Sequence, residues 1–308
     1  MNINMESSIV IPTYNGGDLW RASAKKISLQ KKYAKEIIVI DSSSKDDTTK
    51  ISEDNGFKLV SIPSSEFNHG GTRNLGVSLA ESAIVIFFTQ DAIPNGNAVK
   101  NIIKAFDDPN VAAAFGRQLP HQDANPIAVH ARNFNYKSES YTSHIGVKDK
   151  LGLKTVFISN SFSAYRKSAF EKIGGFPSNT ILCEDMYFSA KAILSGFKVA
   201  YVAEAEVMHS HNYTAIEEFK RYFDIGVFHY DEKWIRESFG GAGGEGMKFI
   251  SSELKFLLNN APAWIPIACV NNLAKILGYK IGQKYTKIPK EMCKKLSMHK
   301  RYWNSISD

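Results

Sequence analysis

Four short runs of β-branched and other apolar residues recur in the first third of the chain, and each ends in polar or turn-forming residues. The runs are SIVIP at 8–12, EIIVID at 36–41, KLVSI at 58–62 and AIVIFFTQD at 83–91. A longer segment with helical spacing follows each run, which is the alternation of βαβ units around a buried parallel sheet. We therefore expect an α/β fold with a mostly parallel central sheet flanked by helices.

Turn and capping residues divide the rest of the chain into further elements. One helix is expected to be capped within 46–48 and to run to about 55, and another to be capped by Thr72 and to run through Ala80. The other expected elements are helices at 96–107, 167–173, 184–194 and 215–236, and strands at 111–116, 154–159 and 198–207. The sequence GGAGGEG at 240–246 predicts a flexible loop, and without a GK[ST] ending it is not a P-loop.

Length and cysteine content limit the class of protein. A chain of 308 residues with 44% hydrophobic residues suits one large α/β domain with an appendage. The three cysteines, Cys183, Cys269 and Cys293, match neither a disulfide framework nor a CxxC metal site, and the first residues lack the pattern of a secretory signal. We expect a cytoplasmic protein with one domain at 1–240, divided near 116–117 into two halves, and a helical tail at 241–308.

The positive charge is concentrated at the C-terminal end. The chain has 38 Lys and Arg against 31 Asp and Glu, a net charge of +7. Residues 271–308 hold nine Lys or Arg against Glu291 and Asp308, so this segment alone carries the net +7 and the preceding residues are formally neutral. This asymmetry argues against a nucleic-acid-binding protein and favours a basic tail that meets an anionic surface such as phospholipid head groups.

Apolar and aromatic residues alternate with lysines at helical spacing from Ala261 onward. Two prolines together with Asn271, Asn272 and Lys275 interrupt this segment before it reaches the ~20 apolar residues of a transmembrane helix. An interfacial helix, with lysines at the head groups of the inner membrane, is the expected structure. The open alternative is a helix that packs on the catalytic domain or on another subunit of a homo-oligomer.

Polar residues stand at the ends of the predicted strands. Tyr14, Asn15, Asp41 and Asp91 follow three of them, and ligands of open α/β sheets bind at the carboxyl ends of strands. Asp91 could hold a divalent cation that neutralises a diphosphate, and Asp41 could accept from a pyrimidine imide or ribose hydroxyls. Taken singly, either aspartate could equally be a turn residue.

Two more candidate groups lie in the second half of the chain. Glu184 and Asp185 open a predicted helix, whose dipole favours their ionised forms, and an ionised Asp185 could take the proton of an attacking hydroxyl. Taken alone, the pair could simply complement the dipole. His209 and His211 follow a strand, and alternation along it predicts that only one ring faces the crevice, as a metal ligand or a diphosphate-binding group. A structural surface histidine is the alternative.

Longer motifs make the sequence similar to a known family. The order SIVIPTYN, IIVIDSSSKDDT, GGTRN, FFTQDA and CEDM resembles the family 2 glycosyltransferases, which have a GT-A fold. The stretches FNHGGTRNLGV, TQDAIP, GRQLPHQDANPIAVHARNFNY, SNSFSAYR, HSHNYT and FGGAGGEG resemble, within that family, the bacterial O-antigen rhamnosyltransferases that use dTDP-L-rhamnose. The resemblance spans about residues 6–305. It implies that 1–240 is a catalytic domain, with a nucleotide-binding half at about 1–116 and an acceptor-binding half at about 117–240.

The resemblance implies a role for each candidate residue. Asp185 would be the catalytic base, with Glu184 positioning it or the acceptor; Asp91 and His209 would bind Mg²⁺ or Mn²⁺. The nucleotide sugar would be bound by Pro12, Tyr14, Asn15, Asp41, Arg73, Gln90 and His211. Two departures matter: Thr89 stands where the family's DxD motif has its first aspartate, and no QxxRW is present, for which Arg221 is a weak substitute.

The implied reaction is inverting transfer of L-rhamnose from dTDP-β-L-rhamnose to a saccharide on undecaprenyl diphosphate, at the cytoplasmic face of the inner membrane. Three alternatives remain: a non-catalytic membrane-associated protein that binds a sugar nucleotide, a transferase that uses another nucleotide sugar, and a nucleotidyltransferase. The last would need a glycine-rich loop with Arg and Lys after the first strand, and SIVIPTYNGG has neither cation. The lack of GxGxxG there argues against a dehydrogenase.

Overall fold

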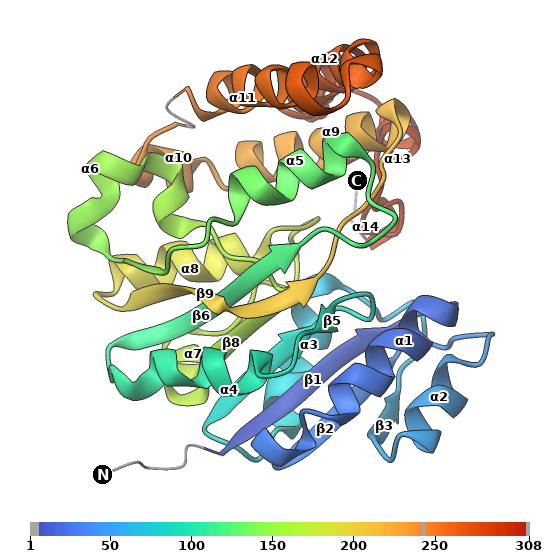
Figure 1. Cartoon of the computed structure of the whole chain (residues 1–308), viewed down its shortest axis with the longest axis vertical. Helices are drawn as coiled ribbons and strands as arrows, with labels where there is room; N and C mark the ends of the chain where they lie inside the picture. The colour runs from blue at the N-terminus through green and yellow to red at the C-terminus, as the bar shows by residue number, and fades with distance from the viewer. Residues whose placement is uncertain (1–5, 242–243, 306–308) are drawn as a thin grey trace.

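The computed structural model describes residues 6–241 and 244–305 as one central sheet with helices on both faces and a further helical layer above it (Figure 1). The strands are β1 (Ser7–Thr13), β2 (Glu36–Asp41), β3 (Lys58–Ser61), β4 (Ile84–Phe88), β5 (Ile93–Pro94), β6 (Val111–Leu119), β7 (Tyr141–Ser143), β8 (Phe162–Arg166) and β9 (Lys198–Met208). Their order in the sheet is β3-β2-β1-β4-β8-β6-β9-β5, with β7 paired to β9.

The sheet is mixed rather than wholly parallel. The strands expected from the four apolar runs, β1 to β4, pair in parallel, and so do β6 and β9. Strand β8 lies between β4 and β6 and runs antiparallel to both. The expected α/β fold is therefore confirmed, with an antiparallel strand at its centre.

Alternating side chains of each strand pack against helices on opposite faces. Ile9 and Ile11 of β1 belong to the core beneath the helices on one face, whereas Val10 belongs to the core beneath the other. One face is covered by α1 (Gly17–Ser28), α2 (Thr48–Asp54) and α4 (Ala98–Ile103), and the other by α3 (His69–Leu79), α7 (Lys167–Ile173) and α8 (Glu184–Leu194). This arrangement leaves the carboxyl ends of β1, β2 and β4 at one edge.

The remaining helices form the layer farthest from the N-terminal strands. They are α5 (Pro126–Asn135), α6 (Lys148–Leu151), α9 (Ala215–Asp231), α10 (Lys233–Phe239), α11 (Glu245–Asn260), α12 (Ile265–Gly282), α13 (Lys290–Leu296) and α14 (Tyr302–Ser305). Helix α12 lies directly on α9, and glycines allow this close approach. A Cβ atom on Gly278 would lie 2.3 Å from the carbonyl oxygen of Phe219, and one on Gly282 would lie 2.0 Å from that of Phe223.

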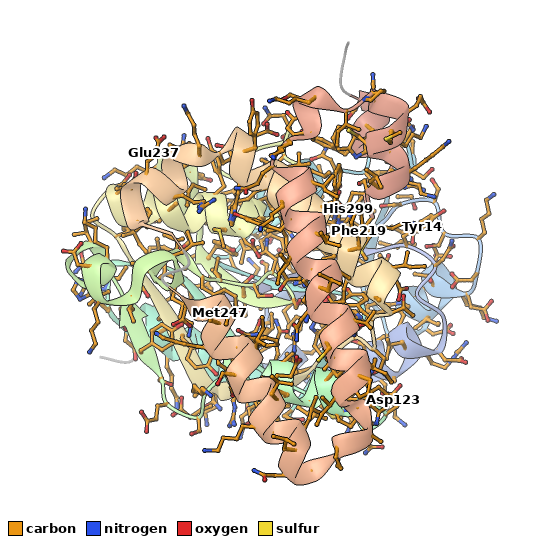
Figure 2. All side chains as sticks on the ribbon, turned by 90° about the horizontal axis from the view of Figure 1, so that it is seen from above. Tyr14, Asp123, Phe219, Glu237, Met247 and His299 are labelled. Atoms are coloured by element: carbon orange, nitrogen blue, oxygen red, sulfur yellow. The ribbon has the colours of Figure 1, made fainter. Side chains whose placement is uncertain are left out.

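Helix α12 has its polar side turned inward. Its buried residues are Ala268, Asn271, Asn272, Lys275, Gly278 and Gly282, and its exposed large apolar residues are Ile267, Val270, Leu273, Ile276 and Leu277. Asn272 donates to the buried Glu253 at 2.6 Å, and Lys275 pairs with Glu218 at 3.3 Å. Figure 2 shows α11 and α12 from above as two legs of a hairpin over the layer below. No helix within the described ranges has the length and hydropathy needed to cross a membrane.

Several predicted elements are wrong in detail. Residues 154–159 do not form a strand, because Gly152–Val156 is a 3₁₀ helix and Ser159 and Asn160 lie in a loop where their side chains serve the site described below. The helix predicted at 215–236 is two helices, α9 and α10, which meet at Glu232.

Two predicted helix boundaries also differ. Helix α3 is capped by Asn68, whose side chain accepts from the Gly71 N–H, and Thr72 lies buried inside the helix. Within the glycine-rich stretch, Ala242 and Gly243 lie outside the described residues, and Glu245 already begins α11.

Candidate active site

Reciprocal hydrogen bonds join the ends of β1 and β4. The Gln90 side chain accepts from the Tyr14 N–H at 2.8 Å and donates to the Tyr14 carbonyl at 3.2 Å. Asn15 adopts φ 46°, a left-handed conformation that is costly for most residues, and its N–H donates to Ser44 Oγ at 2.9 Å. The Tyr14 side chain remains 40% exposed. Together with Pro12, the half-buried strand residue before them, these groups form a partly exposed cluster at the carboxyl ends of β1 and β4.

The buried Asp41 carboxylate holds the loop that lies beside this cluster. Asp41 is 1% exposed. Its Oδ1 accepts from Thr13 Oγ1 at 3.1 Å, and its Oδ2 accepts from the Ser44 N–H at 2.8 Å. These bonds hold the loop in which Ser43 has φ 62°. In this conformation the carboxylate positions the loop, and its direct bond to a nucleotide stays a prediction.

Two residues near the C-terminus, His299 and Arg301, contact the N-terminal half beside this cluster, and the sequence did not predict this. The Arg301 guanidinium lies over the Tyr14 ring, 4.9 Å from its centroid, and His299 Nδ1 is 3.2 Å from Nε2 of His69 at the start of α3. The buried Asp224 of α9 fixes this segment by accepting from the His299 N–H at 3.1 Å. This part of the tail therefore packs on the N-terminal half of the chain, which is the alternative to membrane contact left open above.

One carboxylate and two imidazoles meet beyond the end of β4. Asp91 Oδ2 lies 3.4 Å from His209 Nε2 and 3.6 Å from His211 Nε2, and the three potential ligand atoms lie within 4.8 Å of one another. The prediction that only one of the two rings faces the crevice is wrong. Strand β9 ends at Met208, so the alternation of side chains does not extend to His209 and His211.

Gln118 fixes the orientation of the His209 ring. Its Oε1 accepts from Arg132 and lies 2.9 Å from His209 Nδ1, so Nδ1 must carry the proton and donate. Nε2 then faces Asp91: with a proton it donates to the carboxylate, and without one its lone pair is directed to the same place. A metal-binding imidazole is held in the same way, because the bond at the second nitrogen sets which nitrogen has the free lone pair. Sequence reasoning did not assign Gln118 a role.

The ionisation of this cluster suits a cation. Burial acts to raise the pKa of Asp91, but the hydrogen bond and charge of His209 outweigh it and bring the pKa well below its usual range. Burial, together with the charge of His209, lowers the pKa of His211 to about 4. His121, another histidine that sequence reasoning missed, lies beside the cluster, and burial lowers its pKa as well. At neutral pH the cluster thus offers an ionised carboxylate and a neutral His211.

The second acidic centre lies at the start of α8. Cys183 precedes the helix with φ 59°, so the chain turns sharply into Glu184 and Asp185. Asp185 Oδ2 accepts from the Asn160 N–H at 3.0 Å, and Oδ1 accepts from the Met186 N–H at 2.8 Å. Two main-chain donors therefore fix the plane of this carboxylate.

Glu184 is paired in the interior, beside Asp185. Its Oε1 lies 3.1 Å from Arg73 NH1 and accepts from Asn160 Nδ2 at 2.8 Å, and the Glu184 and Arg73 side chains are each 6% exposed. Arg73 thus neutralises Glu184 and does not reach into the open crevice. Its predicted contact with the base or diphosphate has no supporting contact here and stays a prediction.

The two neighbouring carboxyl groups have opposite pKa shifts. Burial and the charge of Glu184 raise the pKa of Asp185 to about 7. Burial opposes ionisation of Glu184 too, but the charges of Arg73 and His69 lower its pKa. A carboxyl group with a pKa near the working pH has the properties of a general base.

A short loop connects the two centres. Gln118, which orients His209, donates through Nε2 to Ser159 Oγ at 2.9 Å, and the next residue, Asn160, donates to both Glu184 and Asp185. The Asn160 amide is itself fixed, because Oδ1 accepts from the Tyr165 hydroxyl at 2.8 Å. The SNSFSAYR motif carries these residues, but their roles depend on contacts far apart in sequence.

Arg221, the weak QxxRW substitute, lies on α9 near the first cluster. Its guanidinium lies 5.9 Å from the ring centroid of Tyr213, and that ring stacks on His211 with centroids 4.9 Å apart. Arg221 also pairs with Glu218 at 3.7 Å. The side chain is therefore one aromatic ring away from the Asp91 cluster.

Comparison with known proteins identifies the family of the chain and finds relatives that align with nearly all of it. The family model described as glycosyl transferase family 2 matches residues 8–174. The chain is 54% identical over 305 residues to an O-antigen chain rhamnosyltransferase of Salmonella typhimurium, covering 98% of this chain and 97% of that protein. It is 52% identical over 302 residues to an O-antigen chain rhamnosyltransferase of Salmonella anatum, covering 97% and 96%.

Solved structures share the fold at low sequence identity. A mannosyltransferase of Pyrobaculum calidifontis, in complex with GDP-Man and Mn²⁺, is similar over 98% of this chain and 86% of its own, with a TM-score of 0.58 and 16% identity. TarS of S. aureus, in complex with UDP, is similar over 92% and 91%, with a TM-score of 0.54 and 16% identity. These similarities confirm the expected GT-A type of fold.

Proposed function

Because the chain belongs to glycosyl transferase family 2, as the match over residues 8–174 shows, we propose that it transfers L-rhamnose from dTDP-β-L-rhamnose. The acceptor would be a saccharide carried on undecaprenyl diphosphate, in the assembly of an O-antigen chain. The donor sugar is supported by the two Salmonella rhamnosyltransferases, which align with nearly every residue of this chain.

The observation that carries the reaction is the state of Asp185. This carboxylate is held by two main-chain N–H groups and has its pKa raised to about 7. In the proposed step, Asp185 takes the proton of an acceptor hydroxyl while the hydroxyl oxygen attacks the anomeric carbon. The bond from that carbon to the diphosphate oxygen breaks on the opposite face, and dTDP leaves. A β-linked donor therefore gives an α-L-rhamnoside.

The donor would lie along the carboxyl ends of β1 and β4. Tyr14, Asn15 and Gln90 would contact the nucleotide, with Pro12 beside them and Arg301 supplying a cation over the Tyr14 ring. Asp41 and Arg73 would support this pocket from the interior, where their present contacts lie. A non-catalytic sugar-nucleotide-binding protein would have no use for the poised Asp185.

A divalent cation fits the cluster of Asp91, His209 and His211. An ionised carboxylate and two imidazole nitrogens converge within 4.8 Å, and Gln118 leaves the Nε2 lone pair of His209 free. Of the two cations expected, Mn²⁺ fits two imidazoles better than Mg²⁺, which prefers oxygen ligands. When bound, the cation would neutralise charge on the departing diphosphate. His211, assigned to the donor from sequence, would thus share the metal site.

The tail would hold the enzyme at the cytoplasmic face of an anionic membrane. Residues 271–308 carry the whole net charge of +7, and α12 exposes an apolar face that includes Ile267, Val270 and Leu273. An apolar face flanked by lysines suits binding in the head-group region. In this proposal residues 1–240 form the catalytic domain and 241–308 the membrane-binding tail. Self-association through the same face is the competing outcome.

The activity can be tested with a panel of nucleotide sugars. The purified full chain is incubated with dTDP-, UDP- and GDP-sugars and polyprenyl-diphosphate-linked saccharides, and the products are identified by mass spectrometry and by the anomeric configuration of the new linkage. We expect α-rhamnosyl product from dTDP-L-rhamnose. Product from a different nucleotide sugar and none from dTDP-L-rhamnose would overturn the donor assignment.

A further inference from the structure

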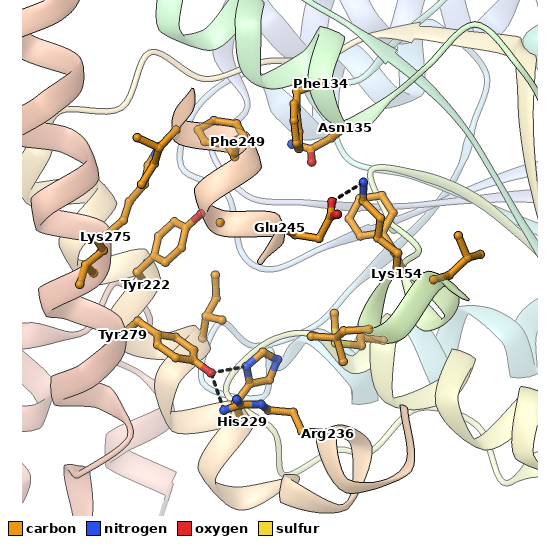
Figure 3. Close-up of a pocket in the computed structure, with 18 of the residues that line it drawn as sticks. Phe134, Asn135, Lys154, Tyr222, His229, Arg236, Glu245, Phe249, Lys275 and Tyr279 are labelled. Carbon is orange, nitrogen blue, oxygen red and sulfur yellow. Dashed lines mark hydrogen bonds and ion pairs between the residues drawn. The ribbon is translucent and has the colours of Figure 1, made fainter. Parts of the chain in front are cut away.

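A large cavity lies beneath the α11–α12 hairpin, and its lining includes none of the residues proposed to bind the donor. Its volume is about 870 Å³, within the range of ligand-binding cavities. Its lining comes from α5, the α6 region, α8 and α9 on one side, and from α11 and α12 on the other. Figure 3 shows Phe134 and Phe249 facing its space from different helices. An apolar space of this size is not filled by the protein's own side chains.

The lining combines carbon surface with positive charge. Most of it is aromatic and aliphatic, including Phe157 and Ile225, and Glu245 is the one acidic residue along it. Its cationic residues are Lys137, Lys150, Lys154, Arg236, Lys275 and Lys280. Six cations against one acid would repel a cationic guest and favour a guest that carries both hydrocarbon and negative charge.

Some of these cations are already paired, and two are available. Lys154 pairs with Glu245 at 2.6 Å, and Lys275 pairs with Glu218 at 3.3 Å. Lys137 donates to the Asn133 carbonyl, and Arg236 donates to the Tyr279 hydroxyl. Lys150 and Lys280 are exposed and have no ion-pair partner among residues 6–241 and 244–305. An anionic group in the cavity would therefore meet free ammonium groups along the lining.

One side of the cavity lies beside the proposed base, and the other lies beside the exposed apolar face of α12. Met186 lines it from α8 and directly follows Asp185, to whose carboxylate its N–H donates. Ile276 lines it from α12 and is 43% exposed, beside Leu273 and Leu277 on the outward apolar face. The cavity thus extends from the outward face of α12 to the residue next to the proposed base.

We propose that this cavity binds the lipid end of the acceptor, an isoprenoid diphosphate. The isoprene units nearest the diphosphate would contact the aromatic walls, and the diphosphate would be bound by Lys150 and Lys280. The saccharide would then extend past Met186 to Asp185. This inference rests on the proposed function for the identity of the acceptor, but its binding chemistry can be tested without transfer.

The test measures binding of geranylgeranyl diphosphate to the full chain by isothermal titration calorimetry. EDTA is present, so that no divalent cation at the Asp91 cluster binds the head group. Ile225→Trp, which fills the cavity, and Lys280→Glu, which reverses a charge of its lining, are compared with Lys255→Glu. Lys255 is an exposed lysine of α11 outside the cavity lining, so its variant makes the same charge change in the other helix of the hairpin.

We expect wild type and Lys255→Glu to bind alike, and both cavity variants to lose at least tenfold in affinity. Thermal melting shows whether Ile225→Trp folds, and the exposed Lys280→Glu decides the question if it does not. Equal weakening by Lys255→Glu and Lys280→Glu, or undiminished binding by a folded Ile225→Trp, would refute the cavity as the site. Rhamnosyl transfer that persists in that case would leave the proposed function intact, whereas cavity binding without transfer from any donor would reject the function alone.

Discussion

The two acidic centres of the active site contain the same functional group in opposite states. Asp91 lies among histidines, and its pKa is held below the usual range although burial opposes this. Asp185 lies beside Glu184 in the interior, and its pKa is raised to about 7. The difference shows that the neighbours of each carboxylate set its role: one stays ionised as a ligand, and the other can take up and release a proton near neutral pH.

The largest effect is expected from the proton acceptor. Asp185→Asn keeps the size of the side chain, but it removes the basicity and leaves one acceptor oxygen for the two main-chain N–H groups, so kcat should fall about 10²–10⁴-fold. Calorimetric affinity for dTDP should be unchanged. Asp123→Asn, the same substitution in an exposed loop near the site, is the control. Wild-type turnover by Asp185→Asn would remove the functional distinction between the two centres.

The next largest effect is expected at the other centre. Asp91→Ala removes the anionic ligand of the cluster and should abolish the gain in dTDP affinity that Mn²⁺ gives the wild type. Since losing a residue that only orients a ligand typically costs about 10–100-fold in metal affinity, losing the ligand itself should cost at least about 100-fold. Calorimetry with and without Mn²⁺ measures this. An unaltered metal-dependent gain would reject Asp91 as a ligand.

A smaller effect is expected from the residue that orients His209. Gln118→Ala removes the acceptor at Nδ1, so the Mn²⁺ concentration for half-maximal activity should rise about 10–100-fold, with most of kcat restored at saturating Mn²⁺. Gln122→Ala, on the exposed loop nearby, is the matched control. A loss of kcat that saturating Mn²⁺ does not restore would show that Gln118 acts through Ser159 and Asn160 on Asp185 instead.

The pH dependence gives the smallest and most direct comparison. Asp185 acts deprotonated, so kcat/KM should fall about tenfold per pH unit below a pKa near 7. Glu184→Gln removes the negative charge that raises this pKa and leaves Arg73 unneutralised, so both changes shift the acid limb to lower pH. Because breaking a buried ion pair typically costs about 3–5 kcal/mol, the profile is measured well below the variant's melting temperature. An unmoved limb would show that Asp185 is not the titrating group.

Much of the fold followed from local pattern. The apolar runs before Tyr14, Asp41 and Asp91 predicted β1, β2 and β4, because a buried parallel strand needs a continuous apolar segment. The same pattern misled at 154–159, where apolar residues line a loop and a cavity wall instead of a strand. Periodicity alone does not distinguish these environments.

The sequence predicted the charged residues of the candidate site but not the residues that position them. Asp91, Asp185 and the histidines stood out because they follow strands or open a helix. Gln118, Asn160 and Arg301 did not, because each acts on a partner distant in sequence: His209, Asp185 and Tyr14 respectively. No local spacing encodes such pairs.

The sequence by itself determined the α/β class, the family, the strand-end carboxylates and the basic tail, since each depends on residue types at short spacing. Tertiary structure alone decided that His209 and His211 face Asp91 together and that Glu184 is neutralised by Arg73 while Asp185 is not. It also decided that α12 turns its polar side inward. These features depend on which distant groups share a low-dielectric interior, and that depends on how the chain packs.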